Sequence, residues 1–259
     1  MTATLQADRP GSATTASPLL RFEGLGLTYP TPKGPYPVLD NINFEVQQGE
    51  FVCVIGHSGC GKSTLLNTVS GFSKPTSGQV LLRGNPIQRP GPDRMVVFQG
   101  YALLPWLSTY DNVALAIESV KPELSEREKR EIVMEHLELV GLTQAAEKLI
   151  TQLSGGMKQR VAIARCLVQK AKIILADEPI ASLDPESART VMDILANTDF
   201  PDVRQKCLIS SAKEGNVLVL PREGGYVFRM YVELDKLRPD ERAAQRKLTQ
   251  VDMIAAANR

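Results

Sequence analysis

The order of hydrophobic and polar residues predicts short strands in the first part of the chain. Apolar and polar residues alternate from Arg21 to Tyr29 and from Asn41 to Glu50, and a stretch rich in Pro and Gly lies between them, from Pro30 to Pro37. Such alternation indicates half-buried strands, and Pro and Gly indicate a loop. Phe51 to Ile55, FVCVI, is apolar throughout, as expected of a strand buried on both faces. Two further strands are predicted within SGQVLLRG, which starts at Ser77, and DRMVVFQ, which starts at Asp93.

The middle of the chain instead has the pattern of amphipathic helices. From Ser125 to Val140 the sequence is first charged and then apolar at Ile132, Val133, Leu137 and Val140. Ser125 followed by Glu128 predicts a capping box at the start of this helix. A second helix is predicted from about Gly155 to Gln169, and the apolar strand Ile173 to Asp177 follows it.

Strands that alternate with helices predict an α/β fold with a mostly parallel sheet covered on both faces. The section from Tyr110 to Ser154 is almost entirely helical, and we expect it to form an inserted lobe of about residues 105–160. Residues 1–20 are rich in Thr, Ala, Ser and Pro and show no period. They lack the basic start and apolar block of a signal peptide, so a disordered extension is predicted.

Composition and charge exclude several classes of protein. The 259 residues include 30 basic and 29 acidic ones, a net charge of +1, so no basic field points to nucleic acid. The four cysteines, Cys53, Cys60, Cys166 and Cys207, form no CxxC pair, which argues against a disulfide framework or a zinc site and favours a reducing compartment. Apolar runs stay far below the ~20 residues that span a bilayer.

The segment Gly56 to Ser63, GHSGCGKS, fits the phosphate-binding pattern G-x-x-x-x-G-K-[ST] between a predicted strand and a predicted helix. Glycines let the backbone approach an anion, and the start of the helix adds its positive end. Lys62 would reach the β and γ phosphates, and the Ser63 hydroxyl would bind Mg²⁺. The segment therefore predicts a nucleoside triphosphate site, made by Gly56, His57, Ser58, Gly59, Cys60, Gly61, Lys62, Ser63 and Thr64.

A pair of acidic residues ends the strand IILAD and supplies the second half of such a site. Asp177 is placed to hold Mg²⁺ through water, and Glu178 to polarise the attacking water. Acidic pairs at strand ends are common, so this motif gains its meaning from the phosphate loop.

The segment Leu153 to Arg160, LSGGMKQR, is a second helix start suited to an anion. With these motifs the sequence resembles the ATP-binding subunits of ABC transporters, which are P-loop NTPases. The resemblance implies a mostly parallel sheet, an antiparallel β subdomain and an inserted helical lobe. It also implies that two subunits hold ATP head to tail, so that Ser154, Gly155 and Gly156 of one grip the γ-phosphate bound by the other.

The same resemblance implies roles for three more residues. Gln99 matches the Q-loop glutamine, which senses Mg²⁺ and couples to the permease. Asp184, in Ser182 to Asp184, matches the D-loop at the dimer interface, and Tyr29 stands where the family stacks an aromatic ring on adenine. A polar strand-end residue and a strand aromatic in the core are the alternative interpretations of Gln99 and Tyr29.

Residues from about 21 to 165 look like the nitrate/nitrite/cyanate importers, through motifs such as GHSGCGKSTLLNTVSGF and PGPDRMVVFQGYALLPWL. This resemblance implies peripheral attachment to the cytoplasmic face of the bacterial plasma membrane, through permease subunits. It also implies a second ATPase subunit, identical or not, and an indirect link to a solute-binding protein. Mg²⁺ and ATP are the expected cofactors.

The resemblance changes along the last third of the chain. Residues 166–197 look like the phosphonate-import ATPases, and 198–259 resemble a section of the flavin-dependent phenol hydroxylases, including PREGGYVFRMYVEL. The ABC domain is therefore expected at 21–197, and a β-rich tail at 198–259 in place of the usual C-terminal portion. A GxGxxG loop for FAD is absent from the sequence, so flavin binding is not expected.

The resemblance also predicts a strand ending in His about thirty residues after Glu178, where the histidine holds the attacking water. At that distance the chain reads CLISSAKEG, and its two histidines, His57 and His136, stand elsewhere. We therefore expect ATP to be bound but turned over slowly. A non-hydrolysing ATP-binding or interaction module and, less favoured, a fragment of an aromatic hydroxylase are the alternatives.

Overall fold

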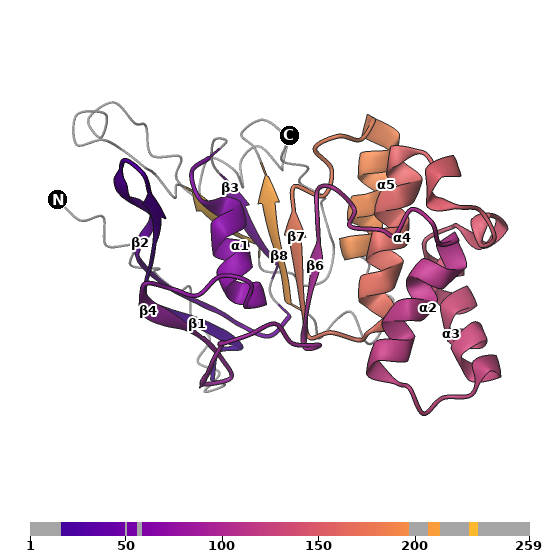
Figure 1. Cartoon of the computed structure of the whole chain (residues 1–259), viewed down its shortest axis with the longest axis horizontal. Helices are drawn as coiled ribbons and strands as arrows, with labels where there is room; N and C mark the ends of the chain where they lie inside the picture. The colour runs from indigo at the N-terminus through magenta and orange to yellow at the C-terminus, as the bar shows by residue number, and fades with distance from the viewer. Residues whose placement is uncertain (1–16, 50, 56–58, 197–206, 213–227, 233–259) are drawn as a thin grey trace.

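The computed structural model describes residues 17–49, 51–55, 59–196, 207–212 and 228–232, and its strands form two sheets (Figure 1). The first sheet is antiparallel, in the order β2 (Gly34–Val46), β1 (Leu20–Thr31), β4 (Ser77–Leu82) and β5 (Asn85–Pro86). The second is parallel, in the order β6 (Arg94–Val97), β7 (Ile173–Asp177), β8 (Cys207–Ala212), β3 (Phe51–Ile55) and β9 (Phe228–Val232). The predicted parallel sheet and antiparallel subdomain are confirmed.

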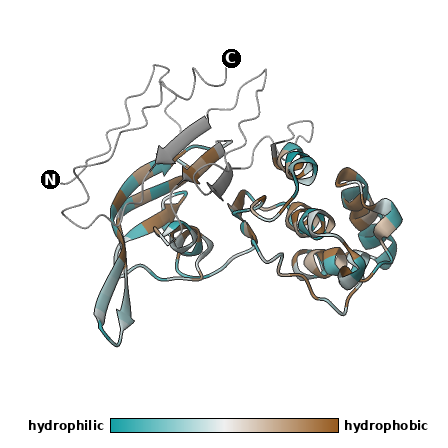
Figure 2. Ribbon diagram, turned by 90° about the horizontal axis from the view of Figure 1, so that it is seen from above, coloured by the Kyte–Doolittle hydropathy of each residue, from teal (hydrophilic) through white to brown (hydrophobic). Residues whose placement is uncertain are grey.

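Helices cover the parallel sheet on two sides. They are α1 (Lys62–Ser70), α2 (Thr109–Val120), α3 (Glu126–Leu139), α4 (Gly155–Val168) and α5 (Pro185–Ala196), with short 3₁₀ turns at Thr143–Ala145 and Ile150–Gln152. In Figure 2, the antiparallel strands and α1 lie on one side of the molecule and the other helices on the opposite side. Both α3 and α4 match the helices that the sequence predicts.

The alternating side chains of β7 show why the sheet needs both layers. Ile173 and Leu175 pack into one core with residues of α1, β1 and β4, whereas Ile174 and Ala176 pack into the other core, with α2 to α5. A strand buried on both faces does not alternate apolar with polar residues, and the first four residues of β7, IILA, are accordingly all apolar. The predicted cover on both faces is confirmed.

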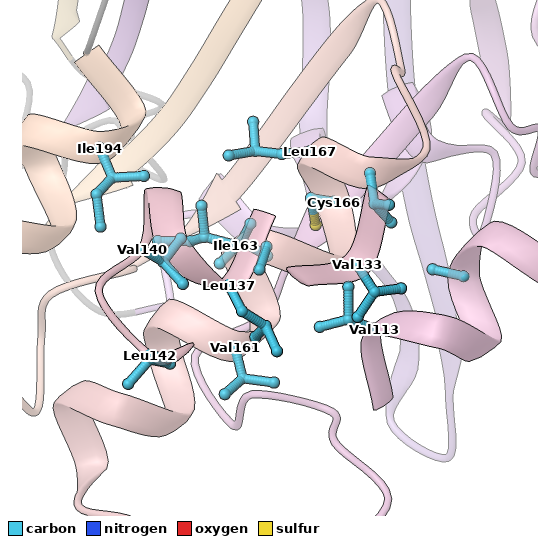
Figure 3. Packing of buried hydrophobic residues seen from close by; sticks show 14 of the residues in the cluster. Val113, Val133, Leu137, Val140, Leu142, Val161, Ile163, Cys166, Leu167 and Ile194 are labelled. Atoms are coloured by element: carbon cyan, nitrogen blue, oxygen red, sulfur yellow. The ribbon is translucent and has the colours of Figure 1, made fainter. Parts of the chain in front are cut away.

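The helical lobe is held by an apolar core (Figure 3). This core includes five side chains that are each 0% exposed: Val113 of α2, Val133 and Leu137 of α3, and Val161 and Ile163 of α4. Of the four apolar positions predicted on α3, Val133, Leu137 and Val140 are buried and Ile132 is half-buried. The capping box is present: the Glu128 amide donates to Ser125 Oγ, and the Ser125 amide donates to Glu128 Oε2 at 2.9 Å.

The predicted loop from Pro30 to Pro37 is wrong, because most of it is strand. Pro30 pairs with Pro35 and Thr31 with Gly34, which leaves Pro32 and Lys33 as the turn. The pairing of β1 with β4 ends at Gly26, so beyond that point each strand of the hairpin has one neighbour. Pro is tolerated there, since an unpaired strand edge needs no N–H donor. The strand expected from Asn41 to Glu50 likewise ends earlier, at Val46.

The chain ends differ from their sequence-based boundaries. Leu19 and Leu20, predicted as part of the extension, are buried, and β1 begins at Leu20. Within the tail, β8 and β9 lie on either side of β3. Residues 1–16 and, within the predicted tail, residues 198–206, 213–227 and 233–259 lie outside the described residues. In the part that the structure describes, no helix has the length and apolar character needed to cross a membrane.

Candidate nucleotide-binding site

The second half of the phosphate loop connects β3 to α1 through two glycines in left-handed conformations. Gly59 has φ +82° and Gly61 has φ +106°, a region that favours glycine. A Cβ on Gly61 would also lie 3.1 Å from Val38 Cγ1 and 3.2 Å from the Val38 carbonyl oxygen. Gly61 caps α1 without a side chain that could accept from its first turn, so those N–H groups suit an anion. Gly56, His57 and Ser58 lie outside the described residues.

The loop lysine and the expected catalytic glutamate lie together in the interior. Lys62 Nζ is 3.8 Å from Glu178 Oε1, and the two side chains are only 4% and 10% exposed. Glu178 has φ +47°, a left-handed conformation that costs a non-glycine residue about 1–3 kcal/mol. Strain of this kind gathers at functional sites, because the surrounding fold holds the residue in place. The arrangement sets a carboxylate directly beside the group expected to bind the phosphates.

The two residues expected to hold a metal ion also meet. Ser63, at the start of α1, donates a hydrogen bond from its hydroxyl to Asp177 Oδ1 at 3.0 Å, from the end of β7. A hydroxyl and a carboxylate oxygen are ligands that Mg²⁺ accepts, usually together with water and substrate phosphates. Ser63 and Asp177 therefore fit a Mg²⁺ ion at the edge of the sheet. Cys60 beside them is buried, and Thr64 is half-buried on α1.

Gln99 lies just past the carboxyl end of the strand next to β7. Val97 pairs with Ala176, so Gln99 follows β6 at the edge where Asp177 ends β7. The side chain is exposed, not part of the core. Tyr101 and Ala102 after it both have positive φ, +62° and +49°, so the loop after Gln99 is sharply bent. Gln99 therefore lies at the same edge of the sheet as Asp177.

The start of α4 touches this loop. Ser154 caps the helix, since its Oγ accepts from the Met157 amide at 3.3 Å. A Cβ on Gly155 would lie 3.0 Å from Tyr101 Oη, and a Cβ on Gly156 would lie 2.5 Å from Ser187 Oγ of α5. The sequence interpretation missed Tyr101 and Ser187. The signal that could have found them is their place in the chain, since Tyr101 stands two residues after Gln99 and Ser187 three residues after Asp184. These contacts fix the LSGG helix start against the Q-loop and α5.

The close packing of Gly156 gives a testable expectation. Replacing Gly156 by Ala should lower the free energy of unfolding by about 1–3 kcal/mol, because the added methyl group overlaps Ser187. Urea unfolding followed by circular dichroism measures it. Gly100→Ala is the matched control, since a Cβ there meets nothing within 4 Å. Equal stability of both variants and the wild type would contradict this packing.

Asp184 lies directly before α5, which begins at Pro185. The Ser187 amide donates to Asp184 Oδ1 at 3.0 Å, and this hydrogen bond holds the pKa of Asp184 below its usual range. Asp184 thus caps the start of α5 in its own chain.

Tyr29 is 40% exposed, so it is not a core residue. Tyr29 pairs with Tyr36 in the hairpin of β1 and β2, two residues before the end of β1.

The strand β8 occupies the place where a histidine was expected. Ser211 of β8 pairs with Asp177 of β7 and with Val54 of β3, so its backbone lies between the acidic pair and the strand that leads into the phosphate loop. His136 lies instead on α3, where its Nδ1 is 2.8 Å from the Ile132 carbonyl oxygen. His57 is outside the described residues. Position 211 is therefore the position of β8 that pairs directly with Asp177.

Comparisons with known protein sequences give one matching family and several relatives. The ABC transporter family profile matches residues 39–181. The bicarbonate transport ATP-binding protein CmpD of Synechococcus elongatus is 64% identical over 167 residues, which cover 64% of this chain and 60% of that protein. The nitrate import ATP-binding protein NrtD of the same species is 58% identical over 186 residues, 72% of this chain and 68% of that protein. The chain thus spans about 60% of the length of its bicarbonate-transport relative.

Solved structures give the same likeness in three dimensions. A dimeric ATP-binding cassette in a post-hydrolysis state, bound to ADP and Pi, is 32% identical with a TM-score of 0.67, covering 74% of this chain and 87% of that one. A dimeric bacterial ABC transporter cassette is 30% identical with a TM-score of 0.67, covering 76% and 95%.

Proposed function

Because the chain belongs to the ABC transporter family and has the P-loop fold of its ATP-binding cassettes, we propose that it is the ATP-binding, energy-coupling subunit of a bacterial ABC importer. The observation that carries the proposal is the meeting of Lys62 with Glu178 and of Ser63 with Asp177 at one edge of the sheet. Two such pairs, contributed by the helix after β3 and by the end of β7, form a site for a metal-bound triphosphate.

In this proposal, the phosphates bind to the loop from Gly56 to Thr64 and to Lys62, while Tyr29 stacks on the adenine. Bound Mg²⁺ would neutralise charge on the phosphates, with Ser63, Gln99 and Asp177 as the residues that hold it. Glu178 orients the attacking water and accepts its proton. Its fixed position beside Lys62 supports this role, since an ordered base needs no rearrangement before the reaction.

The dimer and the transported solute are further parts of the proposal. Ser154, Gly155, Gly156 and Asp184 would complete the nucleotide site of a second ATPase subunit, and the two similar solved cassettes are dimeric. The relatives' names, bicarbonate transport and nitrate import, support a small inorganic anion as solute, with nitrate, nitrite or cyanate our first choice. The chain would attach peripherally to the cytoplasmic face of the bacterial plasma membrane through transmembrane permease subunits, and a solute-binding protein would be an indirect partner.

A second candidate function is an ATP-binding module that does not hydrolyse ATP. The observation that favours it is Ser211, in the place where the family is expected to have histidine. We propose that the chain is a mosaic, with a phosphonate-importer-like section at 166–197 and a phenol-hydroxylase-like tail at 198–259. Of the two functions, we favour the first, in which an intact site hydrolyses ATP slowly.

Stabilisation by nucleotide tests the proposed site. Mg²⁺-ATP at a hundred times its Kd should add about 2.7 kcal/mol to the free energy of unfolding of the wild type. Lys62→Ala should lose most of this gain, because the buried ammonium group would no longer bind the phosphates. Thermal melting with and without Mg²⁺-ATP measures both. Lys74→Ala, an exposed lysine after α1, is the control. A wild type that ATP does not stabilise would contradict the proposal, and so would a Lys62→Ala variant stabilised as strongly as the wild type.

A further inference from the structure

A basic groove lies at the edge of the parallel sheet opposite the nucleotide site. It has a volume of about 440 Å³ and is formed by the turn after β4, the segment before β6 and the residue before β7. Among the described residues that line it are four cationic side chains and one carboxylate: Arg83, Arg89, Arg94, Lys172 and Asp93. The whole chain carries a net charge of only +1, so the groove concentrates positive charge locally.

Arg94 is held rigidly at this groove. Its side chain is 7% exposed, its Nη1 lies 3.0 Å from Asp93 Oδ2, and its Nη2 donates to the Arg89 carbonyl oxygen at 2.8 Å. Its Nε is buried and has no hydrogen-bond partner among the described residues. A buried donor without a partner costs about 1–3 kcal/mol, so the guanidinium is only partly satisfied in this structure.

The backbone around Arg94 is shaped to keep this arrangement. A Cβ on Gly91 would lie 2.7 Å from Asp93 Oδ1 and 3.2 Å from Arg94 Nη2, so a side chain there would displace the ends of these two side chains. The amides of Lys172 and Ile173 donate to the Asp93 carbonyl oxygen at 3.0 and 3.2 Å, which ties the segment to β7. The groove is therefore built from fixed backbone rather than from side chains alone.

A purely structural role explains only part of these observations. An ion pair between Asp93 and Arg94 would suffice to close the segment before β6. It does not explain why Arg83, Arg89 and Lys172 line the same groove, since cations that share a groove repel one another. Guanidinium groups match the geometry of carboxylate and phosphate oxygens, and an anion would offset the repulsion.

We propose that this groove binds a small multivalent oxyanion, a polycarboxylate or a phosphorylated metabolite. Its volume lies within the range of about 300–1,000 Å³ that is typical of small-molecule sites. Arg94 is the first residue of β6, and Gln99 stands five residues after it, just past the other end of the strand. Five residues of extended chain span about 16 Å, which separates the groove from the nucleotide edge. The groove is thus a second site, and its existence does not rest on ATP binding.

The test is isothermal titration of the full chain with citrate and, separately, with inorganic phosphate. At least one of the two should bind saturably to the wild type, and Arg89→Ala combined with Lys172→Ala should weaken it at least about tenfold. Both of these side chains are exposed, so the variant should keep its fold, which its melting temperature checks. Arg127→Ala, with an arginine that is 89% exposed on α3, should bind like the wild type.

Lys62→Ala separates this groove from the phosphate loop. Unchanged binding in Lys62→Ala supports the groove, and loss of binding there assigns the anion to the phosphate loop and overturns the proposal. Absence of saturable binding of both probes to the wild type overturns it as well, as does equal affinity in the wild type and the double variant. Since no nucleotide is used, failure here leaves the proposed ATPase function untouched.

Discussion

Replacing Glu178 by Gln is expected to lower the rate of ATP turnover by about 10²–10⁴-fold while Mg²⁺-ATP still binds. The substitution keeps the size of the side chain but removes the carboxylate that lies 3.8 Å from Lys62 Nζ. Gln cannot accept the proton of the attacking water, so the loss falls on the chemical step. In terms of barrier height, the expected change is about 3–5 kcal/mol.

Phosphate release measures the rate, and thermal stabilisation by Mg²⁺-ATP shows whether binding persists. Glu135→Gln is the matched control, because Glu135 is exposed on α3 in the helical lobe. If Glu178→Gln releases phosphate as fast as the wild type, Glu178 is not the base. The same comparison in the Ser211→His variant, in which turnover is expected to be faster, keeps the difference measurable.

Introducing histidine at position 211 is expected to raise turnover by about 10²-fold or more. Ser211 pairs with Asp177 in the parallel sheet, one residue before the end of β8, the strand on which the family resemblance predicts the histidine. By the family resemblance, an imidazole there would hold the attacking water and contact the γ-phosphate. The backbone needs no change, because the strand that carries the position is already paired with β3 and β7.

Steady-state ATP hydrolysis by Ser211→His and the wild type checks this expectation. Ser210→His, one residue earlier on the same strand, is the control and should leave the rate near that of the wild type. A folded Ser211→His variant with unchanged turnover would show that the missing histidine is not what limits the reaction.

Local sequence predicts most of the nucleotide edge because its features are local. The phosphate loop joins consecutive elements, and Asp177 and Glu178 directly end the strand IILAD, so pattern and spacing suffice. The capping box of Ser125 and Glu128 is equally local, since both partners lie within one helical turn. The meeting of Ser63 with Asp177 follows once the two strands share a parallel sheet.

Contacts between distant segments could not be predicted in this way. The approach of Tyr101 to Gly155 and of Gly156 to Ser187 depends on how the Q-loop, α4 and α5 pack together. The hairpin from Pro30 to Pro35 was missed because Pro indicates a loop wherever its neighbours in the sheet are unknown. The basic groove joins residues from three segments, and no single stretch of sequence shows its charge.

The most direct test of the central claim combines ATP binding and ATP turnover on one preparation of the wild-type chain. Equilibrium dialysis with labelled ATP and Mg²⁺ gives the amount bound per chain, and release of labelled phosphate from the same sample gives the rate. We expect saturable binding of one ATP per chain, lost in Lys62→Ala, together with a turnover that rises on Ser211→His. A chain that binds no ATP would contradict the claim that backbone and Lys62 hold a triphosphate at this edge of the sheet.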